Sequence, residues 1–447
     1  MNISEYFNVD VCNYASYDNY RKIGSCIDGL KPSSRKCIYT IIKNNISTPK
    51  KISQLKSDAA SQTQYLHGDQ SLEGVFVSLA QDFSGSNNIP LLKREGTFGN
   101  RLIPSAAAGR YIFTCKEDYL DYIFRKEDEP ILIQQNFEGE KIEPKYFIPI
   151  IPLLVINGSI GLTTGFTQKI LQHNPKDVIK YLKNKLQNSN KKVTVIPYFK
   201  DFTGSVSEST DKGVGSWNIF GKFEKISSNE IEITEIPINY TLETYTEVLD
   251  KLENEKLIKE YRDLSDDGKF RFRVKFFRTG QGIDINDKNL MSKLKLILSI
   301  TENYTSFDEN NKIKEFQDVY EILDHFYEIR LDYYKKRKQY QITDLKNKIF
   351  ENISKFTFVN GVISNSIVIA KKTDSEIVKQ LEKNEKIIKI NDSYDYLLSM
   401  PMRSMTHENL NRLQDLIKSQ KQKLDEIKNT TLENMWLKDL EELEQKI

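Results

Sequence analysis

The chain has 447 residues, with 65 Lys and Arg against 63 Asp and Glu, and a net charge of +2. This length supports two or three domains with cores of their own. The balance of 29% charged and 38% hydrophobic residues excludes a basic nucleic-acid coat and an acidic disordered chain. The longest apolar run, 147–156, is interrupted by two prolines. A membrane-spanning helix needs about 20 apolar residues, so we expect no membrane segment.

The beginning of the chain has neither a basic nor an apolar leader pattern, so we expect no signal peptide and a cytoplasmic location. Four cysteines without CxxC spacing and four scattered histidines predict reduced thiols and no metal site in this chain. Charge is unevenly distributed, with a net +7 over residues 21–110 and a net −4 over residues 111–165. A local basic surface is typical of phosphate binding, but a solvated lysine-rich face explains the charge equally well.

Residues 1–165 mix short helical patterns with Gly, Pro and Asn turns, which predicts a compact, helix-rich α/β unit. Apolar residues at 38, 41 and 42 share one face of a helix that starts after Lys31-Pro32-Ser33. Those at 72, 75, 76 and 79 follow the spacing of a second amphipathic helix.

Residues 166–310 predict an α+β domain. Alternating or β-branched runs indicate strands at 193–197, 217–220, 230–236 and 271–277. Residues 244–261 have a helical pattern, and the Ser- and Gly-rich stretch 206–216 is typical of a hairpin loop.

Residues 311–447 predict two long helices. The first is a charged helix over 313–350 without Pro or Gly, and the second carries apolar residues at 410, 413, 417, 424 and 427. A smaller segment at about 355–405 separates them. This pattern indicates an antiparallel coiled coil with a globular tip.

The most informative block is 96–114, with the sequence GTFGNRLIPSAAAGRYIFT. Its small residues permit the close approach of another backbone, such as a nucleic-acid strand. A tyrosine is a covalent nucleophile in some enzymes, but an unperturbed pKa of about 10 makes it weak at neutral pH. Arg110 would place one positive charge beside Tyr111. The alternative is a structural tyrosine, since the chain has 23 tyrosines.

The segment AAAGRYIFT resembles the active-site tyrosine motif of type IIA DNA topoisomerases. Six further segments resemble motifs of this family and occur in the same order: DGLKP followed by Arg35-Lys36, YLHGDQSL, YFIP followed by NGSIGL, EITEIP, FYEIRLDYYKKRK and Tyr396-Leu397-Leu398. The resemblance therefore covers the chain from about residue 21 to its end.

The resemblance implies that Tyr111 attacks a DNA phosphodiester and forms a 5′-phosphotyrosyl link with a free 3′-OH. Arg110 would stabilise charge on the phosphate, with a surface salt bridge as the alternative. Arg21 corresponds to a second catalytic arginine, although Arg21-Lys22-Ile23-Gly24 departs from the family's RAxP wording. His67 would orient or protonate the 3′ oxygen, or be a structural histidine. Leu66 stands where the family often has a second histidine.

The same resemblance implies DNA contacts. Lys31, Arg35 and Lys36 would lie at the start of a recognition helix and contact backbone phosphates, with generic solvated cations as the alternative. Leu162 occupies the position of an isoleucine that wedges between base pairs, with an ordinary core leucine as the alternative.

The implied fold class is α+β multidomain. It comprises a winged-helix DNA-gate domain over 1–165, an α/β tower over 166–310, and a coiled coil over 311–447 with a small C-gate tip. Cutting both strands of duplex DNA requires two tyrosines, so we expect a homodimer through the DNA gate and the C-gate.

The sequence has no recognisable ATPase or TOPRIM motifs, so we expect a partner subunit to bind Mg²⁺ and to use ATP. The wording resembles the medium subunit of tailed-phage type II topoisomerases, which implies a nucleoid-associated protein or one in an infected host cell. Two alternatives stay open. One is an A subunit of bacterial gyrase or topoisomerase IV, and the other is a non-catalytic DNA-binding dimerisation protein on the same scaffold.

Overall fold

The structure is a computed structural model that describes residues 3–189, 191–209, 213–278 and 282–447. It divides into two compact units, Met1–Arg330 with Leu437–Ile447, and Leu331–Trp436. Both units contain helices, and the strands lie in the first, so the α+β class expected from the sequence is confirmed.

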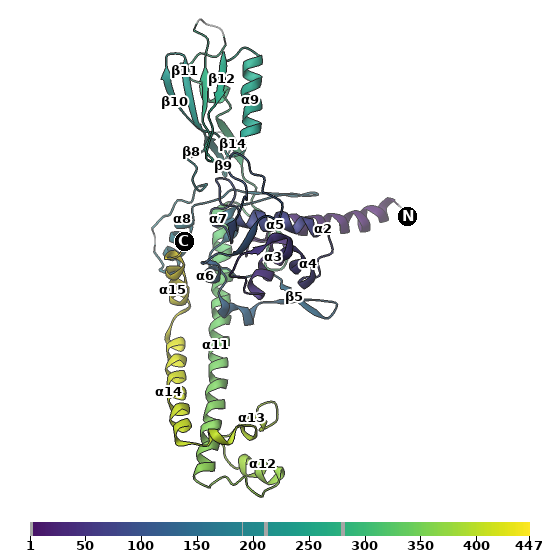
Figure 1. Ribbon diagram of the computed structural model, residues 1–447, viewed down its shortest axis with the longest axis vertical. Helices are drawn as coiled ribbons and strands as arrows, with labels where there is room; N and C mark the ends of the chain where they lie inside the picture. The colour runs from purple at the N-terminus through teal and green to yellow at the C-terminus, as the bar shows by residue number, and fades with distance from the viewer. Residues whose placement is uncertain (1–2, 190, 210–212, 279–281) are drawn as a thin grey trace. The chain divides into compact units, whose positions relative to one another are not determined.

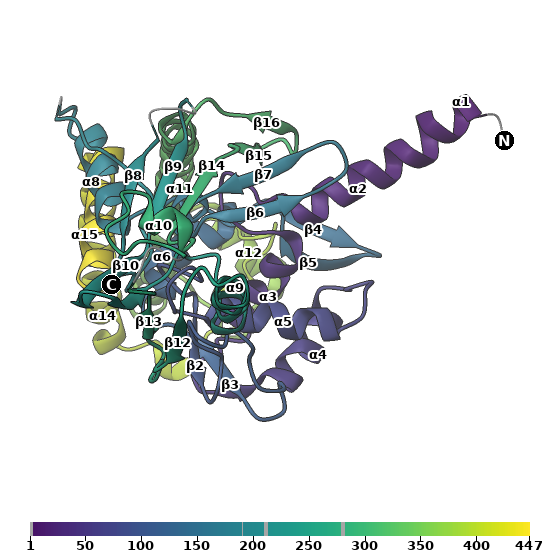
Figure 2. The ribbon, with the colours of Figure 1, turned by 90° about the horizontal axis from the view of Figure 1, so that it is seen from above.

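The N-terminal part of the first unit is a winged-helix arrangement (Figure 2). Its elements follow in the order α3 (Pro32–Lys43), β1 (Lys50–Lys51), α4 (Ile52–Gln62), α5 (Gln70–Ala80), β2 (Leu92–Glu95) and β3 (Phe113–Lys116). The three strands form an antiparallel sheet in the order β1-β3-β2. Both helices expected from apolar spacing are present as α3 and α5. The helix-turn-helix pair is α4–α5, so the recognition-helix position falls on α5 and not, as expected, on α3.

Helix α3 illustrates why the sequence folds this way. Pro32 occupies its first turn, where a missing N–H costs nothing. Ile38 and Ile41 are fully buried on one face. The helix is preceded by α1 (Ile3–Glu5), the π-helix η1 (Tyr6–Val11) and α2 (Cys12–Lys22), whose residues are mostly exposed.

The segment after the sheet carries the apolar run 147–156 into the core. It contains the following elements: α6 (Leu120–Ile123), η2 (Lys126–Ile131), β4 (Gln134–Phe137), β5 (Glu140–Pro144), α7 (Leu153–Asn157), β6 (Ser159–Leu162), β7 (Thr167–Ile170) and α8 (Pro175–Leu186). Leu154, Val155 and Ile156 of α7 are completely buried. Strands β6 and β7 pair as an antiparallel hairpin.

Two further sheets follow in the first unit. One has the order β10 (Lys222–Ser227), β11 (Glu230–Glu235), β13 (Phe272–Lys275) and β12 (Glu260–Asp263), with α9 (Leu242–Asn254) contributing to its core. The other has the order β14 (Ile297–Thr301), β9 (Ser216–Phe220) and β8 (Ser205–Glu208). The remaining elements are α10 (Leu290–Lys293) and the pair β15 (Thr305–Phe307) and β16 (Ile313–Glu315).

Strands expected at 217–220, 230–236 and 271–277 are confirmed as β9, β11 and β13. The expected strand at 193–197 is wrong, because the backbone N–H of Val195 donates to the Tyr320 hydroxyl at 3.0 Å instead of to a neighbouring strand. The helix expected over 244–261 ends early at Asn254, since Lys256 adopts a left-handed φ of 57°. The expected hairpin at 206–216 is formed by β8 and β9, and its residues 210–212 lie outside the described residues.

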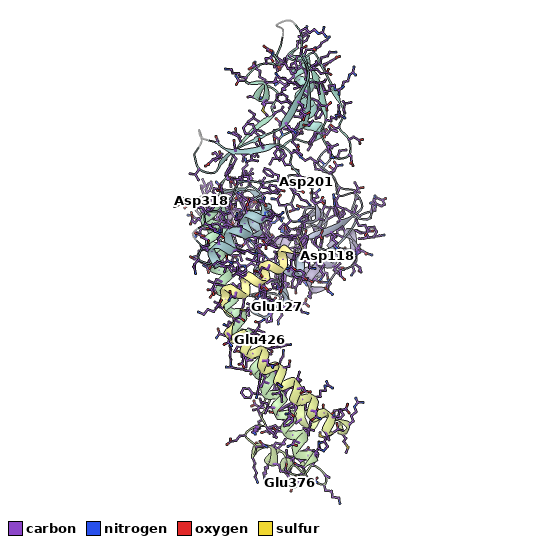
Figure 3. The ribbon with its side chains drawn as sticks, turned by 90° about the vertical axis from the view of Figure 1, so that its left-hand side faces the viewer. Asp118, Glu127, Asp201, Asp318, Glu376 and Glu426 are labelled. Atoms are coloured by element: carbon purple, nitrogen blue, oxygen red, sulfur yellow. The ribbon has the colours of Figure 1, made fainter. Side chains whose placement is uncertain are left out.

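The second unit consists of helices (Figure 1). They are α11 (Val319–Ile363), which begins in the first unit, and α12 (Asp374–Glu382), α13 (Asp395–Leu398), η3 (Met402–Ser404), α14 (His407–Asn429) and α15 (Leu432–Glu444), which ends in the first unit. Within the second unit, α14 runs beside α11. Asn352 of α11 donates to Gln420 of α14 at 3.0 Å. Figure 3 labels Glu376 on α12 and Glu426 on α14.

The long charged helix expected over 313–350 starts later and ends later. Residues 313–315 form β16, and α11 begins at Val319, directly after Asp318, whose carboxylate accepts the Glu321 N–H at 2.8 Å. The helix continues through Gly361, over which Ile367 packs. Phe358 and Val359 at this end join Ile367 in the core of the small segment that carries α12 and α13.

All four cysteines are free thiols. Cys12 on α2 is exposed, whereas Cys26, Cys37 and Cys115 are buried, and burial raises the pKa of each of these three. Within the described ranges, no helix is long and apolar enough to cross a membrane.

Candidate functional site

Tyr111 lies on an exposed turn just before β3. Its side chain is 65% exposed, and its backbone N–H donates to the Ala108 carbonyl at 2.9 Å. The guanidinium of Arg110, also exposed, lies 4.8 Å from the centroid of the Tyr111 ring. The structure therefore places a cation beside an accessible phenol, as expected from the sequence.

The turn that carries Tyr111 is fixed to the start of α4 on both sides of the tyrosine. The Ser53 N–H donates to the Gly109 carbonyl at 3.1 Å, and the Ile52 N–H donates to the Ile112 carbonyl at 3.2 Å. These two bonds leave the Tyr111 side chain free while holding its backbone in place.

Glu73 of α5 forms a third attachment that sequence reasoning missed. Its Oε1 accepts the Gly109 N–H at 2.6 Å, and its Oε2 lies 3.3 Å from the Lys56 ammonium of α4. The signal in the sequence is slight: Glu73 is the single acidic residue of an otherwise uncharged helix.

Arg21 and His67 belong to a second cluster, organised by Tyr17. The Tyr17 hydroxyl forms a hydrogen bond with Nε2 of His67, and the Arg21 guanidinium lies 5.6 Å from the Tyr17 ring centroid. The Tyr65 ring packs edge-on against His67 at 5.4 Å. Sequence reasoning missed Tyr17, although it lies four residues before Arg21 and hence on the same face of α2. Among the described residues, no hydrogen bond or ion pair joins this cluster directly to Tyr111.

Lys31 and Lys36 already have partners within the protein. The Lys31 ammonium donates to the Ile160 carbonyl of β6 at 2.7 Å, and burial lowers the pKa of Lys31. The Lys36 ammonium donates to the Thr63 carbonyl at 2.7 Å and lies 2.8 Å from the Glu143 carboxylate. Both side chains therefore connect elements of the fold, which is a different environment from the solvated phosphate contacts expected.

Arg35 is 4% exposed and forms a two-pronged ion pair with the fully buried Asp28. The Arg35 Nε and Nη2 donate to the two Asp28 oxygens at 2.7 and 3.1 Å. The backbone N–H groups of Leu30 and Phe147 donate to the same carboxylate at 3.0 Å each. Burial alone would lower the pKa of Arg35, but the charge and hydrogen bonds of Asp28, together with nearby Tyr20 and Glu143, outweigh burial and raise the pKa. A guanidinium buried in this way cannot reach a DNA phosphate in this conformation.

Leu162 lies on β6 with 74% of its side chain exposed, so it is not a core leucine. Ile160, two residues earlier on the same face of the strand, is 67% exposed. The sequence did not single out Ile160. Leu162 and Ile160 therefore form a pair of exposed aliphatic side chains on one face of β6.

Two exposed lysines that the sequence analysis did not single out lie close to the tyrosine turn. Lys50 and Lys51 form β1, which pairs with β3, the strand that begins two residues after Tyr111, with Lys51 opposite Phe113. The Lys51 ammonium lies 6.0 Å from the Phe113 ring centroid. Both lysines are thus exposed cations on the strand that pairs with β3.

The described part of the chain contains no group of three or more His, Cys, Asp or Glu side chains arranged to hold a metal ion.

The comparisons with known proteins agree with one another. The family model for the A subunits of DNA gyrase and topoisomerase IV matches residues 21–441. The chain is 33% identical to the mitochondrial DNA topoisomerase 2 of Dictyostelium discoideum, over 99% of the chain and 35% of that protein. It is 34% identical to DNA topoisomerase 2 of Plasmodium falciparum over 99% and 34%, and 32% identical to that of invertebrate iridescent virus 6 over 99% and 39%.

A solved structure gives the same answer for the fold. The Plasmodium falciparum topoisomerase II DNA-binding, cleavage and re-ligation domain matches with a TM-score of 0.88 and 33% identity, over 99% of this chain and 64% of that one. The fold and the sequence match thus define the class, the DNA cleavage and religation core of a type IIA topoisomerase. The chain belongs to the family of the DNA gyrase and topoisomerase IV A subunits. It spans about a third of the length of the curated relatives.

Proposed function

We propose that this chain cleaves and reseals duplex DNA through Tyr111, within an ATP-dependent enzyme that passes a second duplex through the break. The observation that carries the proposal is the Tyr111 turn. Its phenol is 65% exposed, its backbone is bonded to α4 on both sides, and Arg110 lies against its ring. An accessible nucleophile on an immobilised backbone beside a cation is suited to attack on a phosphodiester.

In the proposed reaction, the Tyr111 oxygen attacks phosphorus and loses its proton. The bond from phosphorus to the 3′ oxygen breaks, and that oxygen takes up a proton, leaving a 5′-phosphotyrosyl link and a 3′-OH. Resealing is the reverse reaction. The phosphotyrosyl link stores the energy of the broken phosphodiester, so resealing needs no ATP. The Arg110 guanidinium would stabilise the charge on the phosphate oxygens.

Arg21 and His67 would act from the second cluster. The hydrogen bond between the Tyr17 hydroxyl and Nε2 fixes the His67 ring, and the Arg21 guanidinium lies against the Tyr17 ring. We propose that Arg21 contacts the phosphate and that His67 orients or protonates the 3′ oxygen. Arg21 and His67 would act together with Tyr111 only when bound DNA connects the two clusters.

The proposed DNA surface consists of an apolar wedge and nearby lysines. Leu162 and Ile160 are exposed on β6, and the Lys31 ammonium holds the backbone of that strand through the Ile160 carbonyl. Inserting an apolar side chain between base pairs bends the duplex. Lys50 and Lys51, both exposed beside the tyrosine turn, would contact backbone phosphates.

The assembly is also a proposal. Two chains, each cutting one strand, would form a homodimer through the DNA gate of residues 1–165 and a C-gate in the segment at about 355–405. Residues 166–310 would form the tower and 311–447 the coiled coil. Mg²⁺, acting as a Lewis acid when bound, and ATP would be handled by a partner that carries the TOPRIM and ATPase regions. We propose a role like that of the medium subunit of tailed-phage type II topoisomerases. The protein would act in the compartment where the DNA that it cleaves is replicated.

The test is a covalent-adduct assay on the complete enzyme that contains this chain, with Mg²⁺ and supercoiled DNA, quenched in denaturant. Protein–DNA adducts should form with the wild type and disappear in Tyr111→Phe. Tyr14→Phe is the matched control, because Tyr14 is similarly exposed at 64% and lies on α2. Adducts that persist in Tyr111→Phe would contradict the proposal. A non-catalytic DNA-binding dimer would give no adduct with any variant, and relaxation by this chain alone would contradict the need for a partner.

A further inference from the structure

Two oppositely charged side chains lie behind the Tyr111 turn, Lys56 on α4 and Glu73 on α5. The side chain of each is only 15% exposed, and the ammonium nitrogen lies 3.3 Å from the Glu73 Oε2. Exposed ion pairs contribute little to protein stability. This pair is mostly removed from solvent and has further partners, so its geometry is more strongly fixed.

Glu73 bonds directly to the residue before Arg110. Its Oε1 accepts the Gly109 N–H at 2.6 Å, a charge-assisted hydrogen bond. A Cβ atom at position 109 would lie 2.6 Å from the carboxyl carbon of Glu73 and 2.8 and 2.9 Å from its oxygens. Glycine at 109 therefore lets the carboxylate approach the backbone that carries Arg110 and Tyr111.

Lys56 bonds to the other half of the candidate site. Its ammonium donates to the Gln70 side-chain oxygen at 2.8 Å and lies 3.8 Å from the Asp69 carboxylate. Asp69 and Gln70 directly follow His67-Gly68 in the chain. One ammonium thus contacts both the segment that follows His67 and the carboxylate that holds Gly109.

We infer that Lys56 and Glu73 are positioning residues that set the distance between the His67 turn and the Tyr111 turn. The inference rests on the proposed role of Tyr111, and neither side chain is assigned contact with DNA. Reaction rates are steeply sensitive to such positions, since a displacement of about 1 Å costs on the order of 100-fold. Truncation of the Glu73 carboxyl group or of the Lys56 ammonium would leave Tyr111 present but out of place.

The rival explanation is an ordinary ion pair that only holds α4 against α5. The two explanations differ in what a charge exchange does. In the double variant Lys56→Glu/Glu73→Lys the ion pair is restored, but a lysine at 73 has no acceptor for the Gly109 N–H. An ordinary pair predicts partial recovery in the double variant, since a carboxylate at position 56 also faces Asp69, whereas positioning through Gly109 predicts none.

The experiment measures three quantities on the complete enzyme: the single-turnover rate of covalent adduct formation, the dissociation constant for duplex DNA, and the midpoint of thermal unfolding. The variants are Lys56→Met, Glu73→Ala, Glu73→Gln and the charge exchange. Lys275→Met is the control, because it removes a Lys–Glu pair of 3.0 Å between β13 and β12, outside the site.

We expect Lys56→Met and Glu73→Ala to slow adduct formation by about 10- to 100-fold, with DNA affinity within about twofold of the wild type. Glu73→Gln keeps an acceptor for Gly109 and should lose only about threefold, which also preserves the test if Glu73→Ala does not fold. The charge exchange should be as slow as Glu73→Ala, and Lys275→Met should match the wild type.

Three results would overturn the inference. They are a Glu73→Ala rate within about twofold of the wild type, recovery in the charge exchange, or a loss of DNA affinity that accounts for the slower rate. Failure of the proposed function looks different, because the wild type would then form no adduct or Tyr111→Phe would still form one. The two ideas are therefore tested separately in one set of reactions.

Discussion

Replacing Arg35 with leucine should destabilise the first unit without changing how its surface binds DNA. The change removes the guanidinium that bonds the Asp28 carboxylate and leaves that carboxylate fully buried. The Leu30 and Phe147 amides still donate to it, but its charge is no longer balanced. Breaking a buried ion pair on one side costs about 3–5 kcal/mol.

Urea unfolding measures the stability side of this prediction. The free energy of unfolding of Arg35→Leu should fall by about 3–5 kcal/mol. Lys93→Met is the matched control, because Lys93 and Asp118 also form an ion pair, at 2.6 Å, but with side chains 39% and 82% exposed. Its cost should stay below about 1 kcal/mol.

DNA binding at several salt concentrations tests whether Arg35 contacts a DNA phosphate. Each lost phosphate contact makes the plot of log affinity against log salt shallower by about 0.9. Arg35→Leu, assayed below its unfolding transition, should leave that slope unchanged. An Arg35→Leu protein of wild-type stability with a slope shallower by about 0.9 would refute the argument and restore Arg35 as a phosphate contact.

Three other outcomes are expected. Leu162→Ala should reduce the bend of a bound duplex, measured by energy transfer between dyes at the two ends of the DNA. The free energy of unfolding should change by less than about 0.5 kcal/mol, because Leu162 is 74% exposed. An unchanged bend would show that Leu162 does not act as a wedge. Lys50→Ala and Lys51→Ala should each make the salt slope shallower by about 0.9, and an unchanged slope would show that they do not contact phosphate. Hydrogen bonding to Lys22 lowers the pKa of Asp18 below its ordinary 3.8, so the bond from the Thr164 N–H to Asp18 should persist at higher pH and be lost only as pH falls through that lowered value. The Thr164 amide shift in NMR reports this, and it should not titrate in Asp18→Asn.

The sequence predicts that Arg110 lies beside Tyr111 because the two are neighbours in the chain, and the structure places the guanidinium against the ring. Helix spacing likewise predicted α3 and α5, since their buried faces repeat every three or four residues. The strand predicted at 193–197 is absent because of a tertiary contact. Its pattern is strand-like, but Tyr320 takes the Val195 N–H.

The supporting residues could not be found in this way. Glu73 bonds to Gly109 across 36 positions of the chain, and Tyr17 bonds to His67 across 50. Pairs of residues so far apart in the chain leave no local pattern in the sequence. The internal partners of Lys31, Arg35 and Lys36 could not be predicted for a related reason. Whether Lys36 or Lys51 faces solvent is decided by the surrounding fold, which buries the first against Glu143 and leaves the second on an outer strand.

The burial of three of the four thiols has a practical consequence for following the protein in action. Only Cys12 is exposed, so a maleimide dye should attach at one position in each chain without any substitution. That position lies on α2, five residues before Tyr17 and nine before Arg21. A fluorophore there would report on α2, which carries Tyr17 and Arg21, as DNA enters and leaves an enzyme without substitutions.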